Sequence, residues 1–238
     1  MKKSLVIIPT YNEKENIADI IKVVFGLEKD FDILVVDDNS PDGTAGIVEN
    51  LQKEYPGRLH LLNRPQKEGL GKAYIAGFKW ALAHDYAYVF EMDADFSHPP
   101  KDLLKLLEVL ENDEADVSVG SRYLKGRINV VNWDLKRILL SYFASIYVRL
   151  ITGIPVRDTT AGFVGYKREV LESFDFDKIK FVGYAFQIEM KYVAWKKGFR
   201  IKEVPIIFTD RVKGKSKMHG GIISEAAWGV LKMRFSKF

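Results

Sequence analysis

The stretch SLVIIPTYNEKENIADIIKVVFGLEKDFDILVVDD, residues 4–38, decides the fold because it contains a complete strand, helix and strand. SLVIIP is almost entirely apolar, a helical pattern follows from Asn12 to Leu27, and DILVVDD is a second apolar run. Continuous apolar runs of this length are typical of strands covered on both faces, as in parallel sheets. The stretch therefore predicts a βαβ unit.

The same alternation continues through the first half of the chain. The runs RLHLLN and YAYVFEMD enclose a helical pattern from Gly69 to His84. A helix is predicted from Pro99 to Leu110, since proline is tolerated in a first helical turn, and the strand DVSVGS follows. The pattern predicts an α/β fold, a mostly parallel sheet with helices on both faces. With DVSVGS the sheet is expected to be complete.

Beyond about Gly126 the regular alternation fades. The sequence predicts a helix from Trp133 to Ile151, the turn-rich segment RDTTAGFVGYK, a helix from Tyr184 to Lys197 and the strand RIKEVPIIFTD. No linker, repeat or low-complexity tract separates the halves. We therefore expect one domain over residues 1–238, in which residues 1–125 and 126–238 form the two sides of a cleft.

Composition is that of a globular protein, since 47% of the 238 residues are hydrophobic and 29% are charged. The absence of cysteine excludes disulfides, thiolate zinc sites and cysteine nucleophiles, so a metal would be bound mainly by oxygen ligands. The first apolar run is too short for a signal-peptide core. No transmembrane helix is predicted, because Arg149 interrupts the nearest candidate, ILLSYFASIYV.

The net charge of +4 is compatible with nucleic acid, an anionic membrane or an anionic substrate. Basic residues are spread along the chain until RVKGKSK, so a nucleic-acid partner is the weaker interpretation and none is predicted. Arg211 and Lys217 lie in this glycine-containing segment, which follows the last strand. It is interpreted as a basic lid over an anionic substrate, or alternatively as an ordinary solvated loop.

The run DADFSHPP places two carboxylates at the end of a predicted strand. Asp93 and Asp95 are two residues apart, so in an extended strand they point to the same side. Like charges so placed repel unless a cation lies near them, and hard oxygen ligands suit Mg²⁺ or Mn²⁺ bound to a diphosphate. The alternative is that they cap the helix near Pro99 or lie in a solvated loop.

Asp37 also ends an apolar strand, where an acidic residue can accept hydrogen bonds from a ribose or a base. The alternative is that it belongs to the acidic turn NSPDG. The chain has no phosphate-binding loop of the GxxxxGK[ST] type, so metal and basic side chains would have to bind a diphosphate. The residues alone therefore predict a metal-dependent enzyme acting on a nucleoside diphosphate compound.

Seven stretches together resemble glycosyltransferase family 2 and, within it, the dolichol-phosphate (polyprenol-phosphate) mannose synthases. They span residues 9–218 in the family's order and are PTYNE, VVDDNSPDGT, GLGKAYIAGF, EMDADFSHPP, GSRY, RDTTAGF and DRVKGKSKM. The resemblance implies a GT-A (Rossmann-like) fold, GDP-mannose as donor, Mg²⁺ or Mn²⁺ as cofactor, and inverting transfer of mannose to a polyprenyl (dolichyl) phosphate.

The resemblance also implies roles for individual residues. The implied donor-binding residues are Pro9, Tyr11, Glu13, Val35, Asp37, Asp93, Ala94, Asp95, Arg122, Arg211 and Lys217. Asp95, Arg122, Arg211 and Lys217 would be catalytic, and Asp93 and Asp95 would hold the metal. Ser97 stands where some relatives carry glutamine as a further metal ligand. Many relatives also append transmembrane helices, and this chain resembles the short form without them.

A polyprenyl phosphate is already anionic at neutral pH, so it needs no general base. This agrees with the sequence, in which the candidate bases Glu13, Glu189, His98 and His219 have no recognisable partner. Arg122 and Arg137 are predicted to place the acceptor phosphate. The rival predictions are transfer of glucose or another sugar to a polyprenyl phosphate or a saccharide, and a binding module without activity.

Two helical stretches, ILLSYFASIYVRLI and GGIISEAAWGVLKMRFSKF, mix apolar, aromatic and basic residues as interfacial helices do. The alternative is that they are core helices. The predicted location is cytoplasmic, peripheral on the cytoplasmic face of a membrane. Attachment would use the C-terminal amphipathic helix, with Trp228 on its apolar side, or a membrane-anchoring partner protein.

Overall fold

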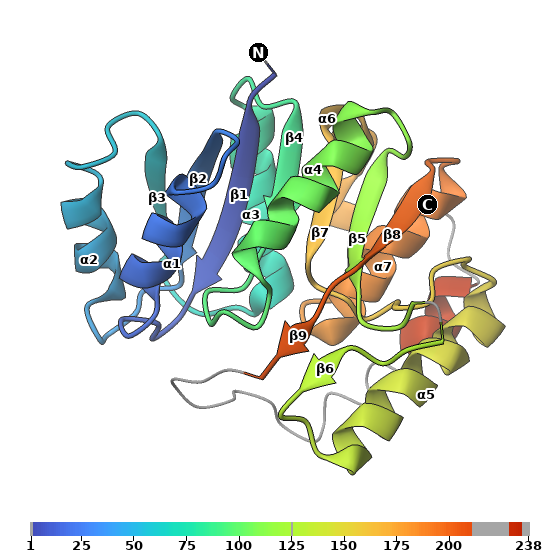
Figure 1. Cartoon of the computed structure of the whole chain (residues 1–238). Coiled ribbons are helices and arrows are strands. Elements are labelled where there is room, and N and C mark those ends of the chain that lie inside the picture. Colours follow the sequence, from blue (N-terminus) through green and yellow to red (C-terminus); the bar gives the residue numbers. More distant parts are fainter. Residues whose placement is uncertain (1, 125, 211–228, 235–238) are drawn as a thin grey trace.

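A seven-stranded sheet forms the centre of the computed structural model, which describes residues 2–124, 126–210 and 229–234 (Figure 1). The strand order is β3-β2-β1-β4-β7-β5-β8. The strands are β1 (Ser4–Thr10), β2 (Phe31–Asp37), β3 (Leu59–Asn63), β4 (Tyr88–Glu91), β5 (Val117–Ser121), β7 (Val164–Lys167) and β8 (Ile201–Pro205). Neighbouring strands are parallel except where β7 pairs with β4 and β5. The predicted α/β fold is confirmed.

Helices cover both faces of the sheet. They are α1 (Ile17–Phe25), α2 (Thr44–Leu51), α3 (Leu70–Leu82), α4 (Leu103–Glu111), α5 (Leu135–Thr152), α6 (Arg168–Glu172) and α7 (Tyr184–Lys196), with short 3₁₀ turns η1 (Pro100–Asp102) and η2 (Phe176–Lys178). One apolar core lies between the sheet and α1, α2 and α4, and a second lies between the sheet and α3, α6 and α7. Alternate residues of β1 point into opposite cores, which explains its continuous apolar sequence.

The expectation that DVSVGS completes the sheet was wrong. The segment predicted as turn-rich contains β7, which is inserted antiparallel between β4 and β5, and β8 pairs with the other side of β5. The glycine in β7 has a packing reason: a Cβ at Gly165 would lie 2.5 Å from the Phe90 ring and 2.7 Å from Ser118 Oγ. A residue that reads as a turn signal is therefore required for close strand packing.

The predicted final strand is interrupted after Pro205. Its end forms β9 (Phe208–Thr209), which pairs with β6 (Val130–Val131) in a separate two-stranded sheet. β6, β9 and α5 lie beside the edge to which β1 points (Figure 1). Residues 229–234 pack with α5 and α7 in a third apolar cluster that includes Val148, Tyr192 and Met233. Among the described residues, no helix has both the length and the apolar character needed to span a bilayer.

Candidate active site

Three loops at the carboxyl edge of the sheet carry the residues that the sequence singled out. β1, β2 and β4 are adjacent and parallel, so the loops that follow them meet at one edge. Each loop contains one non-glycine residue in the left-handed backbone region: Asn12 (φ 57°), Asn39 (φ 56°) and Phe96 (φ 62°). This conformation is strained, most of all for a bulky residue such as Phe96, and strain of this kind clusters at functional sites.

The first two loops are tied together by Asp37. Its carboxylate accepts hydrogen bonds from Thr10 Oγ1 (2.7 Å), Ser40 Oγ (2.6 Å) and the Ser40 amide (2.8 Å), and its side chain is fully buried. Ser40 Oγ in turn accepts the Asn12 amide at 3.0 Å. In this arrangement Asp37 orders both loops, and its predicted contact with a nucleotide stays a prediction.

The other predicted donor contacts differ in their exposure. Pro9 and Tyr11 are partly exposed at the end of β1, and Lys67 Nζ lies 4.5 Å from the centre of the Tyr11 ring. Glu13 is buried in the loop that follows. The Val35 side chain is fully enclosed in the core beneath α1 and α2, so it can support the pocket from below but presents no surface to a ligand.

Arg64, which sequence analysis missed, lies beside these loops and is buried. Its Nη1 donates to Asp38 Oδ1 at 2.7 Å and its Nη2 to Glu68 Oε2 at 2.6 Å. Burial raises the pKa of Asp38, and the Arg64 charge opposes that effect. The pair therefore fixes the backbone next to Asp37 without leaving an isolated buried charge.

Asp93 and Asp95 follow β4 in different surroundings. The Asp93 side chain is 37% exposed, and the Tyr74 hydroxyl lies 3.5 Å from its Oδ1. Burial raises the pKa of Tyr74 well above its usual value, and the Asp93 charge adds to the effect, so the phenol stays a neutral donor. Asp95 is largely buried, and its Oδ1 accepts the Ser97 amide at 3.1 Å. Two carboxylates thus lie just beyond the carboxyl end of β4.

The donor set of this loop fits a small divalent cation. Asp93 and Asp95 offer hard oxygen atoms, and the buried Ser97 Oγ has no hydrogen-bond partner among the described residues. Ala94 is buried between the two aspartates. Across the ranges that the structure describes, no cluster of three or more acidic or histidine side chains could hold a metal. Further ligands would have to come from a diphosphate and water, as is usual for Mg²⁺.

An aromatic bridge, His98, Phe208 and Trp133, connects this loop to the second half of the chain. His98 Nδ1 accepts the Asp93 amide at 3.1 Å, and the imidazole meets the Phe208 ring edge to face at 5.6 Å. Phe208 in turn lies 5.3 Å from the Trp133 ring. Burial lowers the pKa of His98 to about 4, so the ring is neutral and structural at physiological pH. This counts against His98 as a general base.

Arg122, directly after β5, is held by a buried carboxylate. Its Nε and Nη2 donate to Asp158 Oδ2 and Oδ1 at 2.7 and 2.6 Å, and its amide donates to Oδ2 at 2.9 Å. Nη2 also donates to Thr160 Oγ1 at 2.8 Å. Burial acts to raise the pKa of Asp158, but the Arg122 charge and hydrogen bonds lower it. A bidentate pair of this kind fixes the guanidinium plane.

Arg137, on the first turn of α5, reaches the same aromatic bridge. Its guanidinium lies 4.1 Å from the centre of the Trp133 ring, and that of Arg122 lies 5.4 Å from it. Arg137 Nη1 donates to Asp210 Oδ2 at 2.8 Å. Two arginines that are 15 positions apart in the sequence thus meet at one ring. Arg211 and Lys217, also predicted for this site, lie outside the described residues.

Sequence analysis had not assigned roles to Asp158 and Trp133, which organise the arginines. Asp158 belongs to RDTTAGF, a motif that supported the family resemblance without giving this residue a role. Trp133 was noted only as the beginning of a predicted helix. Glu189, considered as a base, accepts the amides of Lys180 and Phe181 at 3.0 Å each and is 1% exposed. It therefore stabilises the segment before α7.

Comparisons with known proteins show which proteins the chain is similar to. A family model described as "Glycosyl transferase family 2" matches residues 5–174. The chain is 45% identical over 234 residues to a polyprenol monophosphomannose synthase of Mycolicibacterium smegmatis, with 96% of this chain and 88% of the relative covered. It is 43% identical over 228 residues to an undecaprenyl-phosphate mannosyltransferase of Micrococcus luteus, with 96% and 92% covered.

Solved structures share the fold at lower identity. A mannosyltransferase of Pyrobaculum calidifontis, in complex with GDP-Man and Mn²⁺, aligns with a TM-score of 0.61 and 22% identity. The alignment covers 90% of this chain but only 58% of that enzyme. Glucosyl-3-phosphoglycerate synthase of Mycobacterium tuberculosis aligns with a TM-score of 0.69 and 17% identity, covering 100% of this chain and 82% of the synthase. These likenesses confirm the predicted GT-A architecture.

Proposed function

The chain belongs to glycosyl transferase family 2, and we propose that within this family it transfers mannose from GDP-mannose to a polyprenyl phosphate, with inversion at the anomeric carbon. One observation carries the proposal. The carboxylates after β4 and the two arginines at Trp133 are joined by the aromatic bridge, so groups suited to a metal and groups suited to phosphates face one site.

Asp93 and Asp95 would hold Mg²⁺ or Mn²⁺, which when bound supplies positive charge to the departing diphosphate. Arg122 adds a fixed positive charge, because Asp158 holds its guanidinium in place. Arg137, with a partly exposed side chain, is placed to attract the acceptor phosphate. The predicted basic segment with Arg211 and Lys217 would complete the charge around the diphosphate.

Two of the candidate bases, His98 and Glu189, are already engaged in other hydrogen bonds, which agrees with a phosphate acceptor. The Nδ1 lone pair of the neutral His98 ring already accepts the Asp93 amide, so Nδ1 is not available to take a proton, and the Glu189 carboxylate accepts two amides. A phosphate oxygen that is already anionic attacks without losing a proton, whereas a saccharide hydroxyl would need one removed. The protein's task is then to align the phosphate behind the anomeric carbon.

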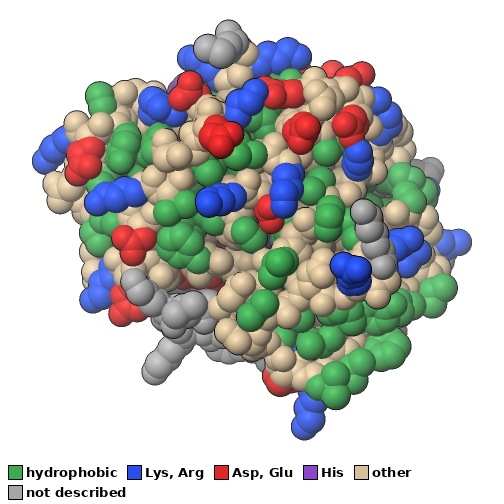
Figure 2. All heavy atoms as spheres, in the orientation of Figure 1, with side chains coloured by type: hydrophobic (Ala, Val, Ile, Leu, Met, Phe, Trp, Pro, Cys, Tyr) green, Lys and Arg blue, Asp and Glu red, His purple; other side chains and the backbone are tan. Residues whose placement is uncertain are grey.

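The lipid part of such an acceptor lies in a membrane, so the protein needs a surface that binds the membrane. Helix α5 has the properties of such a surface. Its sequence, LKRILLSYFASIYVRLIT, contains no acidic residue. Leu135, Leu139, Phe143 and Leu150 recur at helical spacing, and each is at least 44% exposed. Figure 2 shows hydrophobic side chains gathered where α5 lies in Figure 1. We propose that this stripe rests in the interfacial layer of a bilayer, peripheral to it.

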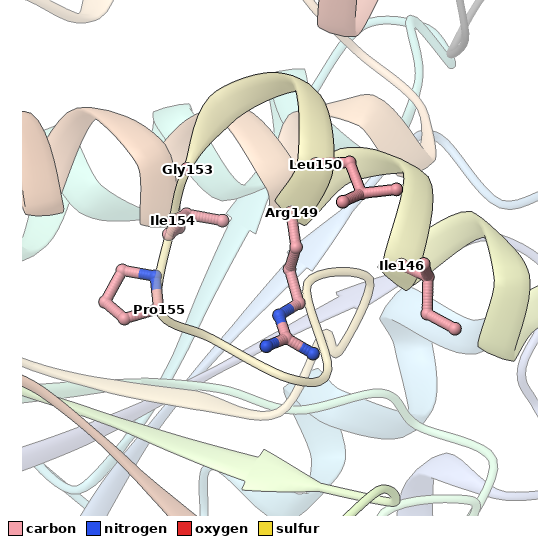
Figure 3. Close-up of a pocket in the computed structure, with 6 residues that line it drawn as sticks. All are labelled: Ile146, Arg149, Leu150, Gly153, Ile154 and Pro155. Carbon is pink, nitrogen blue, oxygen red and sulfur yellow. The ribbon is translucent and has the colours of Figure 1, made fainter.

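Arg149 extends the stripe at the end of α5. Together with Ile146, Leu150, Ile154 and Pro155 it lines a shallow pocket of about 320 Å³ (Figure 3). An arginine beside apolar side chains suits a headgroup phosphate above an acyl layer. The same surface could serve a membrane-anchoring partner protein, and an assay with the purified chain and vesicles alone separates the two cases.

The test is transfer of labelled mannose from GDP-mannose to a short polyprenyl phosphate in detergent, with and without Mg²⁺ or Mn²⁺. Asp95→Asn should reduce metal-dependent transfer about a hundredfold or more, whereas Asp177→Asn, at an 87% exposed aspartate, should not. A parallel reaction with UDP-glucose tests the rival donor. Product from UDP-glucose alone would overturn the assigned sugar, and undiminished transfer by Asp95→Asn would overturn the assigned metal ligand.

A further inference from the structure

Lys191 is a charged side chain in the centre of the protein. It lies on α7, is 0% exposed, and its Nζ donates a 2.6 Å hydrogen bond to the Ala161 carbonyl. Among the described residues, no carboxylate oxygen lies within 4.0 Å of Nζ. Removing an ammonium group from water is unfavourable unless it is compensated, so an aliphatic residue would be more stable at this position. The lysine therefore requires an explanation beyond packing.

The Ala161 carbonyl belongs to a segment, residues 157–161, that charged side chains fix at three points. Glu203 on β8 accepts the amides of residues 157 and 158 at 2.8 and 2.9 Å. Arg122, after β5, binds the carboxylate of Asp158. Lys191, on α7, donates a hydrogen bond to the carbonyl of Ala161, the last residue of the segment. Three elements thus converge on five residues, one of which orients an arginine of the site.

Burial is the main influence on the pKa of Lys191 and lowers it to about 8, while nearby carboxylates, Asp158 among them, oppose that effect. Lys191 therefore acts on the same segment in two ways, through its hydrogen bond to Ala161 and through its charge near Asp158.

We propose that Lys191 is a positioning residue for Arg122. By holding Ala161 it fixes the segment that carries Asp158, and Asp158 fixes the plane of the guanidinium. Lys191 contacts no substrate in this role. The proposal rests on the proposed function, because it presumes that Arg122 acts on a phosphate group during mannose transfer.

Lys191→Met tests the proposal, because methionine preserves the length and flexibility of the side chain and removes the charge and the hydrogen bond. We expect kcat for mannose transfer to fall about tenfold, with the KM for GDP-mannose changed less than about threefold. The thermal midpoint should be unchanged or higher, since removing a buried ammonium relieves a desolvation cost. Lys197→Met, at an exposed position at the end of the same helix, is the matched control.

A double-mutant cycle identifies the route of the effect. If Lys191 acts through Arg122, Lys191→Met should reduce transfer less than about twofold in an Arg122→Lys background. An equal loss in both backgrounds, unchanged transfer, or a loss matched by thermal destabilisation would each overturn the positioning role.

Hydrogen exchange gives a measurement that does not depend on catalysis. The amides of residues 157–161 should exchange faster in Lys191→Met than in the native chain, while those of β1 and β2 keep their protection. Unchanged exchange in that segment would overturn the proposal. If the native chain transferred no mannose to any polyprenyl phosphate, the proposed function would fail, whereas the exchange experiment would still decide whether Lys191 holds the segment.

Discussion

At the scale of single residues, charged groups of the site are oriented by other side chains before any ligand binds. Asp158 holds Arg122 at two points, and Asp210 together with the Trp133 ring holds Arg137. Orientation in advance reduces the conformational entropy that the arginine side chains would otherwise lose when a phosphate binds. The two arginines differ in one respect: Arg122 is almost enclosed, whereas the Arg137 side chain is 30% exposed. Arg137 is accordingly the better candidate for a substrate that arrives from outside.

Arg137→Ala should raise the KM for a short, water-soluble polyprenyl phosphate about tenfold and leave the KM for GDP-mannose nearly unchanged. The reason is that one charge-assisted contact to the acceptor phosphate is lost. Steady-state kinetics with each substrate varied in turn measure the effect. Arg157→Ala, at an exposed arginine, is the control. An unchanged acceptor KM would contradict the role of Arg137.

The sequence identified the candidate ligands better than their partners. Asp93, Asp95 and Arg122 could be found because each directly follows an apolar strand, and strand ends meet at one edge. Asp158 could not, since it lies 36 positions from Arg122 and only the three-dimensional fold brings the two together. Val35 also lies near a strand end, but its side chain points into the core, which its position in the sequence does not reveal. Its contact with a donor stays a prediction.

At the scale of elements, α5 has two different faces. Ser145, Val148 and Thr152 are buried, while the stripe of Leu135, Leu139, Phe143 and Leu150 is exposed. The buried face fits the core-helix alternative, and for the exposed face the interfacial alternative stays a prediction. The Tyr123 hydroxyl donates to Ser141 Oγ at 2.8 Å, which links the helix to the residue next to Arg122. A membrane contact would thus lie close to the arginines of the site.

The double substitution Leu139→Ser with Phe143→Ser should weaken binding to anionic vesicles about tenfold, because two apolar side chains no longer enter the interfacial layer. Vesicle co-sedimentation measures the affinity. Transfer to a short, water-soluble acceptor should be unaffected, since both side chains are exposed in the folded chain. Val23→Ser, at an exposed valine on α1, is the control, and equal vesicle binding by all variants would exclude α5 as the membrane surface.

Elements with a clear apolar pattern were predicted well, whereas two strands of the second half were not. The helix predicted from Gly69 to His84 is present as Leu70–Leu82. β7 escaped prediction because glycine and the polar residues before it suggested a turn, although Gly165 is needed for contact with Phe90. The last predicted strand is two strands in the structure. Its first part, β8, pairs with β5 up to Pro205, and its last part, β9, pairs with β6.

At the scale of the whole molecule, one ionic cluster joins β5, from the first half of the chain, to β7 and β8, from the second half. Asp116, just before β5, accepts hydrogen bonds from Lys167 Nζ (3.0 Å) at the end of β7 and from Arg200 Nη2 (2.8 Å) before β8. These hydrogen bonds, Arg200 first, hold the pKa of Asp116 well below its ordinary value of 3.8. The cluster therefore connects three neighbouring strands, β7, β5 and β8, at the edge of the sheet opposite the site.

Asp116→Asn should lower the stability at neutral pH by about 2 kcal/mol, or roughly 4–8 °C in thermal midpoint. Because the folded-state pKa of Asp116 is depressed, its contribution is complete above the unfolded value near 3.8 and is lost as the pH falls below that value. The difference between the native chain and the variant should therefore shrink under acid conditions. Thermal melts from pH 7 to pH 3 measure it, with Asp85→Asn as control, and a difference independent of pH would contradict this account.

The place of β7 in the sheet also has a consequence for synthesis on the ribosome. β4 and β5 leave the ribosome before β7, and each then has an unpaired edge that only residues 164–167 can cover. Exposed strand edges promote aggregation, so the nascent chain must remain incompletely folded until this late segment arrives. A foreign second half could replace the native one only if it supplied a strand that fits between β4 and β5.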